Sequence, residues 1–405
     1  MRRLFEILTP LWLIGLIFPP TLDLEWKEAL QSASALWLPV AGVIAGRAGF
    51  LYGPVFREQP GILLACGTLF VMLAVSSIVC EDPLRSLGYT GLSLLMFVGC
   101  AGLWELLRAG IGRVALYYSL LGSAITGYIY WNAPDYSAAF QGRLSFEGSH
   151  PNHLGLVAFG VLGTALFVSN PYLRWGLAGL NLMVIVAAQA RGSFLAAITA
   201  IVVRALLLYV TGERLRSRRT LLAAAAACVC ASAFLTQWDW VRAAVYDLFL
   251  LDDRYRGLGT GFTGRIEAWQ EAFELFRANP IFGVGFRMHE RYMSSLPSAH
   301  NGYLSMLADT GIAGTLATFL LLGIAGSRVA RMALSGNRQA IFAASFFAGY
   351  CAIAMFERFL INVGNPTSVL VWLLLFLPGA KLRVKLLEPA ADGAAQQAAA
   401  EARAG

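Results

Sequence analysis

Apolar runs close to 20 residues long recur along almost the whole chain. They fall at about residues 7–21, 34–52, 61–80, 88–107, 112–131, 153–170, 173–189, 192–211, 219–237, 302–326, 339–356 and 366–380. An α-helix needs a run of this length to cross a bilayer, and it satisfies its own backbone hydrogen bonds there. The pattern predicts an all-α, polytopic membrane protein with about 12 transmembrane helices.

Composition supports the same fold class. Hydrophobic residues make up 58% of the 405-residue chain and charged residues only 14%, with a mean hydropathy of +0.62. A soluble protein of this length carries about a quarter charged residues. The first run ends at Phe18-Pro19-Pro20 without a small-residue cleavage pattern, so we expect a retained first helix rather than a signal peptide.

The basic residues of the short loops indicate the orientation in the membrane. With the N-terminus inside, the inner loops are rich in arginine, as at 214–219, and the short outer loops carry few basic residues. This alternation follows the positive-inside rule. It predicts cytoplasmic termini and one large outer loop at 238–301. We expect a single transmembrane domain over 1–387 and a disordered or weakly helical cytoplasmic tail at 388–405.

Neither the charge nor the cysteines indicate nucleic-acid or metal binding. Most of the net charge of +7 sits in short loops beside apolar runs, as membrane topology requires. The six cysteines fall in or at the ends of apolar runs, and none has metal-ligand spacing with a histidine, so we interpret them as small buried residues. Asp252-Asp253 has no third ligand in view. We expect no metal and no cofactor.

The loop at 238–301 is the one long polar interval, with seven arginines and two of the chain's four histidines. Its segment 263–279 carries an apolar stripe at helical spacing, formed by Ile266, Trp269, Phe273 and Phe276. This spacing predicts an amphipathic helix along the membrane surface, capped by Thr263, with the stripe packed on the membrane domain and Arg265 in its first turn. Ser298 is placed to cap the next helix.

Three residues lie at the outer ends of different predicted segments: Arg191, Arg265 and His300. Each has an ordinary interpretation, in which Arg191 snorkels to a lipid phosphate or pairs with an acid, Arg265 is solvated, and His300 caps a helix. A helical bundle could instead bring them together. Two guanidinium forks and an imidazole suit a pyrophosphate group, and the imidazole can accept a proton from a hydroxyl.

Four short motifs follow one another along the chain. They are Arg191-Gly192-Ser193, Gly264-Arg265-x-x-x-Trp269, Asn279-Pro280-Ile281-Phe282-Gly283-Val284-Gly285-Phe286, and His300-Asn301-x-x-Leu304-x-x-Leu307-x-x-x-Gly311-x-x-Gly314. Ahead of them stands Ser149-His150-Pro151-Asn152-His153-Leu154-Gly155. In this order the motifs resemble those of the bacterial O-antigen ligase and polymerase superfamily, over roughly residues 140–320.

The resemblance implies a glycosyltransferase of the bacterial inner membrane, with a layout similar to that of other (GT-C-like) enzymes acting on polyprenyl donors. Its donor would be a polysaccharide on undecaprenyl pyrophosphate, and no metal would be required. Arg191 and Arg265 match the family's phosphate-binding arginines, and His300 matches its essential histidine. The active site would face the periplasm, at the loop. Further residues expected to contact phosphates or sugars are Arg143, Asn152, Arg287, Arg291 and Asn301.

The first hypothesis is an O-antigen ligase that transfers the glycan, with inversion, to a hydroxyl of lipid A–core oligosaccharide in lipopolysaccharide biosynthesis, as a monomer. An O-antigen polymerase or a protein O-oligosaccharyltransferase would share this chemistry. A transporter of an anionic lipid or solute is the alternative from another class. A transporter would carry its charges near the bilayer midplane, whereas here they gather at one face.

Overall fold

The computed structural model describes residues 2–17, 27–45, 59–107, 110–133, 142–146, 150–212, 265–358 and 360–375. The expected span at 219–237, the first part of the loop at 238–264 and the tail at 388–405 lie outside the described residues. Thr263, the expected cap of the loop helix, is also outside them.

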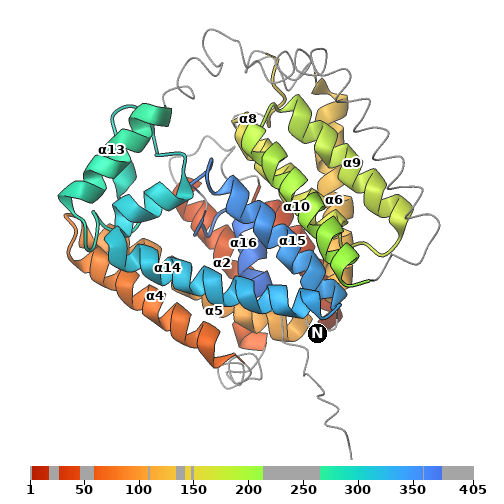
Figure 1. The fold of residues 1–405 in the computed structure, drawn as a ribbon, viewed down its shortest axis with the longest axis horizontal. Coiled ribbons are helices and arrows are strands. Elements are labelled where there is room, and N and C mark those ends of the chain that lie inside the picture. Colours follow the sequence, from red (N-terminus) through yellow and green to blue (C-terminus); the bar gives the residue numbers. More distant parts are fainter. Residues whose placement is uncertain are drawn as a thin grey trace, which may run out of the picture.

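All regular elements of the described chain are helices (Figure 1). They are α1 (Arg2–Gly15), α2 (Lys27–Ala45), α4 (Pro60–Ile78), α5 (Pro83–Leu107), α6 (Ile111–Trp131), α8 (Pro151–Ala165), α9 (Pro171–Ala187), α10 (Arg191–Val210), α13 (Arg265–Ala278), the short 3-10 helix η5 (His289–Arg291), α14 (Gly302–Leu334), α15 (Arg338–Ile353) and α16 (Pro366–Leu375). The all-α prediction is confirmed for this part of the chain.

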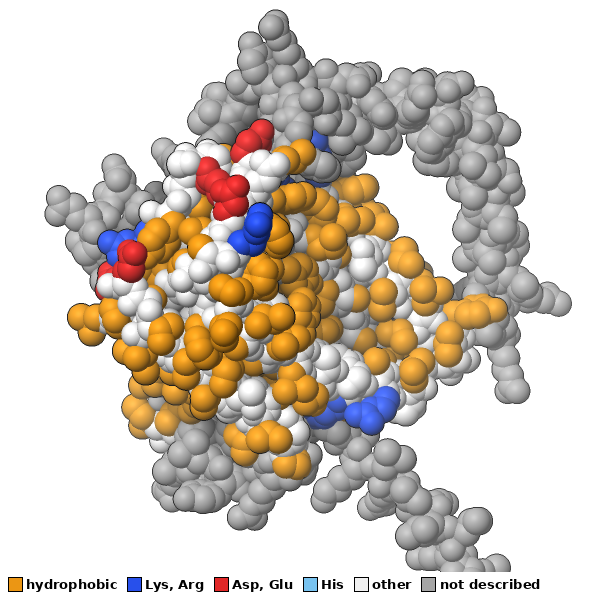
Figure 2. Space-filling model, turned by 60° about the vertical axis from the view of Figure 1, so that its left-hand side comes forward, with side chains coloured by type: hydrophobic (Ala, Val, Ile, Leu, Met, Phe, Trp, Pro, Cys, Tyr) orange, Lys and Arg blue, Asp and Glu red, His pale blue; other side chains and the backbone are white. Residues whose placement is uncertain are grey.

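Four helices are long and apolar enough to cross a membrane: α4, α5 over Pro83–Trp104, α10 and α14. The apolar stretches Ser34–Ile44 of α2 and Pro171–Ala187 of α9 are shorter. In Figure 2 hydrophobic side chains cover most of the visible face, and charged ones gather in its upper part and at its lower edge. Outward apolar side chains such as Leu64, which is 73% exposed, are what a lipid-facing surface requires. The fold is that of a helical membrane protein, while about 12 spans and an outer loop remain predictions.

Proline and asparagine set where several helices begin. Proline is the first residue of α4, α8 and α9, where its missing N–H costs no hydrogen bond. The Asn170 side chain accepts hydrogen bonds from the backbone N–H groups of Tyr172 and Leu173, and so caps α9. Asn337 caps α15 in the same way. These local signals fix the helix ends, which is where the functional side chains lie.

The core forms around α8, which is buried along most of its length and packs against α6, α9 and α10. Helix α10 packs in turn against α15. At Gly349 of α15 an added Cβ would lie 2.6 Å from the backbone oxygen of Ala196 in α10, so a glycine allows the two helices to approach this closely. The result is a tight bundle of α8, α9, α10 and α15 that holds the ends of all four helices in fixed positions.

Helix α14 is broken at Gly311, whose φ of 60° and ψ of −162° are not helical. The turn at 280–285 lies against the break and forms backbone hydrogen bonds with the residues on both sides of it. Ile312 N donates to Pro280 O at 2.9 Å and Gly285 N donates to Asp309 O at 2.8 Å. Backbone N–H and C=O groups that lose their helical partners at the break therefore form hydrogen bonds to the turn. Such bonds are needed because unpaired backbone groups are costly in a low-dielectric environment. Two of the sequence motifs thus meet as one interlocked unit.

Two local predictions for the loop were wrong. Ser298 does not cap α14, because the Asn301 side chain does so by accepting from the N–H groups of Tyr303 and Leu304. The aromatic stripe of α13 does not pack as expected either. Its buried residues are Ala268 and Ala272, because small side chains let the helix lie close to the protein, while Phe273 is 47% exposed. The helix that the spacing predicted is present over Arg265–Ala278, and Arg265 is its first described residue.

Candidate active site

A cavity of about 380 Å³ lies where one end of α8, of α10 and of α13 meets the segments before α14 and after α15. It is lined by Arg143, His150, Asn152, Gln189, Ala190, Arg191, Gly192, Ser193, Arg265, Leu296, His300, Phe356 and Glu357. Three arginines and two histidines make its wall strongly basic, with one carboxylate among them. Such a wall suits an anionic ligand with several phosphate oxygens.

The three residues expected to do the chemistry all line this cavity. Arg191 is the first residue of α10, Arg265 is the first described residue of α13, and His300 lies two residues before α14. Arg191 and His300 therefore sit at helix starts, where backbone N–H groups without helical partners add positive potential. Arg143 and Asn152, expected with lower weight to contact substrate, line the same cavity.

The short turn between α9 and α10 presents Arg191 to the cavity. Gln189 in this turn has a φ of 48°, which is rare for a residue with a side chain. The buried guanidinium of Arg143 holds the turn, because its Nε and Nη2 donate to the carbonyl oxygen of Ala188 at 3.2 and 3.0 Å. Arg143 therefore combines two tasks: it adds a positive charge to the wall and fixes the turn that carries Arg191.

Asn152 connects Arg143 to a buried carboxylate. Its Oδ1 accepts from Arg143 Nη2 at 3.0 Å, and its Nδ2 donates to Glu357 Oε1 at 3.0 Å. The other carboxylate oxygen of Glu357 lies 3.8 Å from His300 Nδ1, which is beyond hydrogen-bond distance but close enough for attraction. His300 has a φ of 45°, so two of the residues with unusual backbone angles line one cavity. Strain of this kind tends to collect at functional sites.

Burial and neighbouring charges shift the pKa values of two residues in the cavity wall, His150 and Arg265. Burial, followed by the positive charge of Arg143, lowers the pKa of His150 to about 4, so its imidazole is neutral near pH 7. His150 Nδ1 accepts from the N–H of Asn152 at 3.2 Å and caps α8. Burial also lowers the pKa of Arg265, and the Glu357 carboxylate opposes this. The attraction between a partly buried cation and an incoming anion is stronger than that between a fully solvated cation and the same anion.

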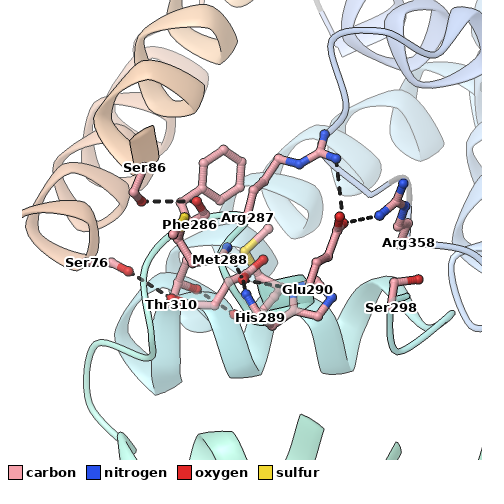
Figure 3. A network of polar contacts seen from close by, with 12 residues as sticks. Ser76, Ser86, Phe286, Arg287, Met288, His289, Glu290, Ser298, Thr310 and Arg358 are labelled. Carbon is pink, nitrogen blue, oxygen red and sulfur yellow. Dashed lines mark hydrogen bonds and ion pairs between the residues drawn. The ribbon is translucent and has the colours of Figure 1, made fainter. Parts of the chain in front are cut away.

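A separate polar network fixes the loop that leads to His300 (Figure 3). The Asp309 carboxylate of α14 accepts from the N–H of Met288 at 2.9 Å and of His289 at 2.8 Å, and it lies 2.8 Å from His289 Nδ1. Burial lowers the pKa of His289, but the charge and the hydrogen bond of Asp309, together with the charge of Glu290, outweigh burial and raise the pKa. From α4, Ser76 donates to the Asp309 carbonyl oxygen, and from α5, Ser86 donates to Phe286 O.

Glu290 ties this loop to the segment that carries Glu357. It forms an ion pair with Arg358, and its Oε1 lies 3.7 Å from Arg287 Nη2 (Figure 3). Since Arg358 directly follows Glu357, the loop and the end of α15 are held together beside the cavity. The positions of His300 and Glu357 relative to each other depend on this connection.

Three of the expected substrate-binding residues do not line the cavity. Arg287 lies over the Tyr89 ring at 5.4 Å and next to Glu290. Arg291 Nη1 donates to Asp82 Oδ2 at 2.6 Å. The Asn301 side chain caps α14. These residues hold the loop in place in this structure, and a role for them in substrate binding remains a prediction.

Sequence reasoning did not select Glu357, although this carboxylate is 7% exposed and lines the cavity beside His300. The signal was present, because an acid between the last two apolar runs is costly unless it has a partner. Gln189 was not selected either, since only its position in a strained turn distinguishes it.

Residues 176–319 match the family model described as O-antigen ligase. The matched range contains Arg191, Arg265 and His300 and the interlocked motifs at 280–285 and 311. A search of curated proteins returned no match. The match supports the resemblance of residues 176–319 to the O-antigen ligase/polymerase superfamily, whose members are membrane glycosyltransferase-like enzymes.

Proposed function

We propose that the protein is an O-antigen ligase. It would transfer a polysaccharide from undecaprenyl pyrophosphate to a sugar hydroxyl of lipid A–core oligosaccharide, at the periplasmic face of the inner membrane. The observation that carries this proposal is the meeting of Arg191, Arg265 and His300 in one cavity. The family match supports lipid-linked glycan chemistry and leaves ligase and polymerase both open.

In the proposed reaction the arginines hold the leaving group. As the bond between the anomeric carbon and the pyrophosphate oxygen breaks, negative charge grows on the diphosphate. Guanidinium groups that are already in place stabilise this charge in the transition state without reorganising, and one such donor is commonly worth about 3 kcal/mol. Arg191 and Arg265 take this role, with Arg143 at the edge of the same wall.

His300 is assigned as the general base. Its imidazole accepts the proton of the acceptor hydroxyl while the hydroxyl oxygen forms the new glycosidic bond, and undecaprenyl pyrophosphate departs from the opposite face. Glu357, 3.8 Å from His300 Nδ1, would stabilise the resulting imidazolium. The sequence of events is one displacement, which inverts the configuration at the anomeric carbon.

The test uses proteoliposomes with purified lipid-linked polysaccharide and lipid A–core. We expect Arg191→Ala, Arg265→Ala and His300→Ala each to lower the transfer rate by about 100-fold or more, since each removes transition-state stabilisation or proton transfer. Arg277→Ala is the matched control, because Arg277 lies in the same helix as Arg265, α13, and is exposed in its last turn. Wild-type transfer by His300→Ala would exclude this base.

Donor and acceptor choice separates ligase from polymerase. We expect transfer when lipid A–core is offered as acceptor and none when a second lipid-linked repeat unit is offered. Elongation of the lipid-linked repeat would instead identify a polymerase. In cells, deletion of the gene should remove the long lipopolysaccharide ladder and leave the core intact, whereas a core with a single repeat unit would indicate the polymerase.

A further inference from the structure

A second cavity, of about 640 Å³, lies at the opposite ends of α8, α9 and α10 from the active site. Residues at the start of α8 and α10 line the candidate active site, whereas residues at the end of α8, the start of α9 and the end of α10 line this cavity. It is lined by Gly112, Leu116, Leu166, Phe167, Val168, Ser169, Asn170, Pro171, Leu173, Arg174, Arg204, Leu208, Arg338, Gln339 and Ile341.

Three arginines from three different helices converge on this cavity: Arg174 of α9, Arg204 of α10 and Arg338 of α15. Arg174 is buried, and its guanidinium is held by donating to the carbonyl oxygens of Val168 at 2.7 Å and Ser169 at 3.1 Å. These two hydrogen bonds orient the cation beside the cavity. A fixed guanidinium is well suited to bind phosphate oxygens, because its donors are planar and already in place.

The cavity also receives two helix starts. Asn170 and Pro171, at the beginning of α9, line it, as do Arg338 and Gln339 at the beginning of α15. Positive potential at a helix N-terminus adds to that of the guanidinium groups and favours an anion. The three arginines and the two helix N-termini therefore all favour an anion in this cavity.

The surroundings show what kind of anion belongs there. The cavity wall includes apolar side chains, among them Leu116, Leu173 and Leu208. Next to it, aromatic side chains point outward from the first turns of α9 and the last turn of α10: Tyr172 is 88% exposed, Trp175 47% and Tyr209 60%. Exposed Tyr and Trp at the ends of apolar helices mark the level of lipid headgroups. A ligand at this level that has a charged headgroup and hydrocarbon chains would contact the arginines with its headgroup and apolar side chains with its hydrocarbon chains.

We propose that this cavity binds the phosphate headgroup of one anionic phospholipid, from the leaflet at this end of the bundle. Basic pockets between membrane helices are suited to such headgroups. The lipid would connect α9, α10 and α15 from outside, and α10 carries Arg191 at its other end. This site is separate from glycosyl transfer and does not depend on the proposed activity.

The test measures lipid binding by the full-length purified protein in a neutral detergent, with phosphatidylglycerol, phosphatidylcholine or inorganic phosphate as the probe. Native mass spectrometry counts bound lipid, and thermal unfolding measures stabilisation. The variant Arg204→Gln/Arg338→Gln removes two cations and leaves the brace formed by Arg174 intact. Arg331→Gln is the matched control, because Arg331 is exposed in the last turn of α14 and does not line the cavity.

We expect phosphatidylglycerol to bind and to raise the Tm, and the double variant to bind it at least about tenfold more weakly, as loss of charge-assisted contacts implies. Arg331→Gln should behave like the wild type. Equal binding by the wild type and the double variant would overturn the proposal. If phosphatidylcholine raised the Tm as much as phosphatidylglycerol does, the cavity would not select an anionic headgroup, and the proposal would be wrong. If inorganic phosphate alone raised the Tm as much, the cavity would bind phosphate rather than a lipid, which would also overturn it.

Discussion

Glu357 Oε2 and His300 Nδ1 lie 3.8 Å apart in the wall of the candidate active-site cavity. The carboxylate comes from the segment after α15 and the imidazole from the segment before α14. The His300 Nδ1 atom is buried and makes no hydrogen bond to any residue that the structure describes. A small movement would let the carboxylate hold the ring in one tautomer, with Nε2 free to accept a proton.

Glu357→Gln tests this relationship. The amide keeps an oxygen for the Asn152 Nδ2 hydrogen bond but has no charge to stabilise an imidazolium at His300. We expect kcat to fall by about 100-fold, within the range of general-base effects. The measurement is the rate of glycan transfer in proteoliposomes, with the Tm of the variant as a check on folding. An unchanged rate with an unchanged Tm would exclude an electrostatic role for Glu357.

Arg143 should act through the position of Arg191 as well as through its own charge. Arg143→Lys keeps the charge but cannot donate from two guanidinium nitrogens to the Ala188 carbonyl oxygen. We expect about a tenfold lower kcat/KM, because Arg191 would lose its fixed turn. Steady-state kinetics with the lipid-linked donor give this value. If Arg143→Lys matched the wild type while Arg143→Ala did not, charge alone would account for Arg143.

The pair of His289 and Asp309 should contribute to stability in a pH-dependent way. The folded-state pKa of His289 lies above its ordinary value of 6.5, because Asp309 favours the charged imidazole. Its stabilising contribution is therefore fully present below pH 6.5 and is lost as the pH rises through the raised pKa. We expect Asp309→Asn to lower stability by about 3 kcal/mol at low pH, since it leaves a buried cation unpaired.

Thermal unfolding of both proteins across this pH range provides the measurement. The Tm difference between wild type and Asp309→Asn should shrink as the pH increases above 6.5. His289→Gln should remove this pH dependence from the wild-type curve. A Tm difference that stays constant with pH would show that the pair does not titrate as described.

The break in α14 gives a further prediction with an internal control. At Gly311 an added Cβ would meet the backbone of Ile281 and Phe282, and the positive φ disfavours any side chain. We expect Gly311→Ala to cost about 2 kcal/mol or more and to reduce activity. Gly323→Ala, in the same helix with no atom within 4 Å of its Cβ position, should leave Tm and activity unchanged or slightly improved. Equal effects of the two substitutions would contradict a special role for the break.

Periodicity and local motifs predicted the helices well because they depend on residues close in sequence. The helix at Arg265–Ala278 and the all-helical class of the described chain follow from such patterns. The meeting of Arg191, Arg265 and His300 was inferred from the ends of predicted segments, and the structure brings these ends to one cavity.

Other features could not be predicted because they depend on contacts between distant segments. Which face of α13 is buried depends on how close Ala268 and Ala272 come to the protein, which overrides the larger aromatic stripe. The kink at Gly311 occurs because the turn at 280–285 supplies the missing hydrogen-bond partners. Glu357 joins the site only because Asn152 and the loop bring it there.

The hydrogen bonds between the turn at 280–285 and the broken part of α14 at 308–313 bear on how this protein can be re-engineered. The two stretches supply each other's backbone hydrogen-bond partners. Replacing the loop alone with that of a relative would therefore leave backbone N–H and C=O groups of α14 without partners. A chimera should therefore exchange both stretches together.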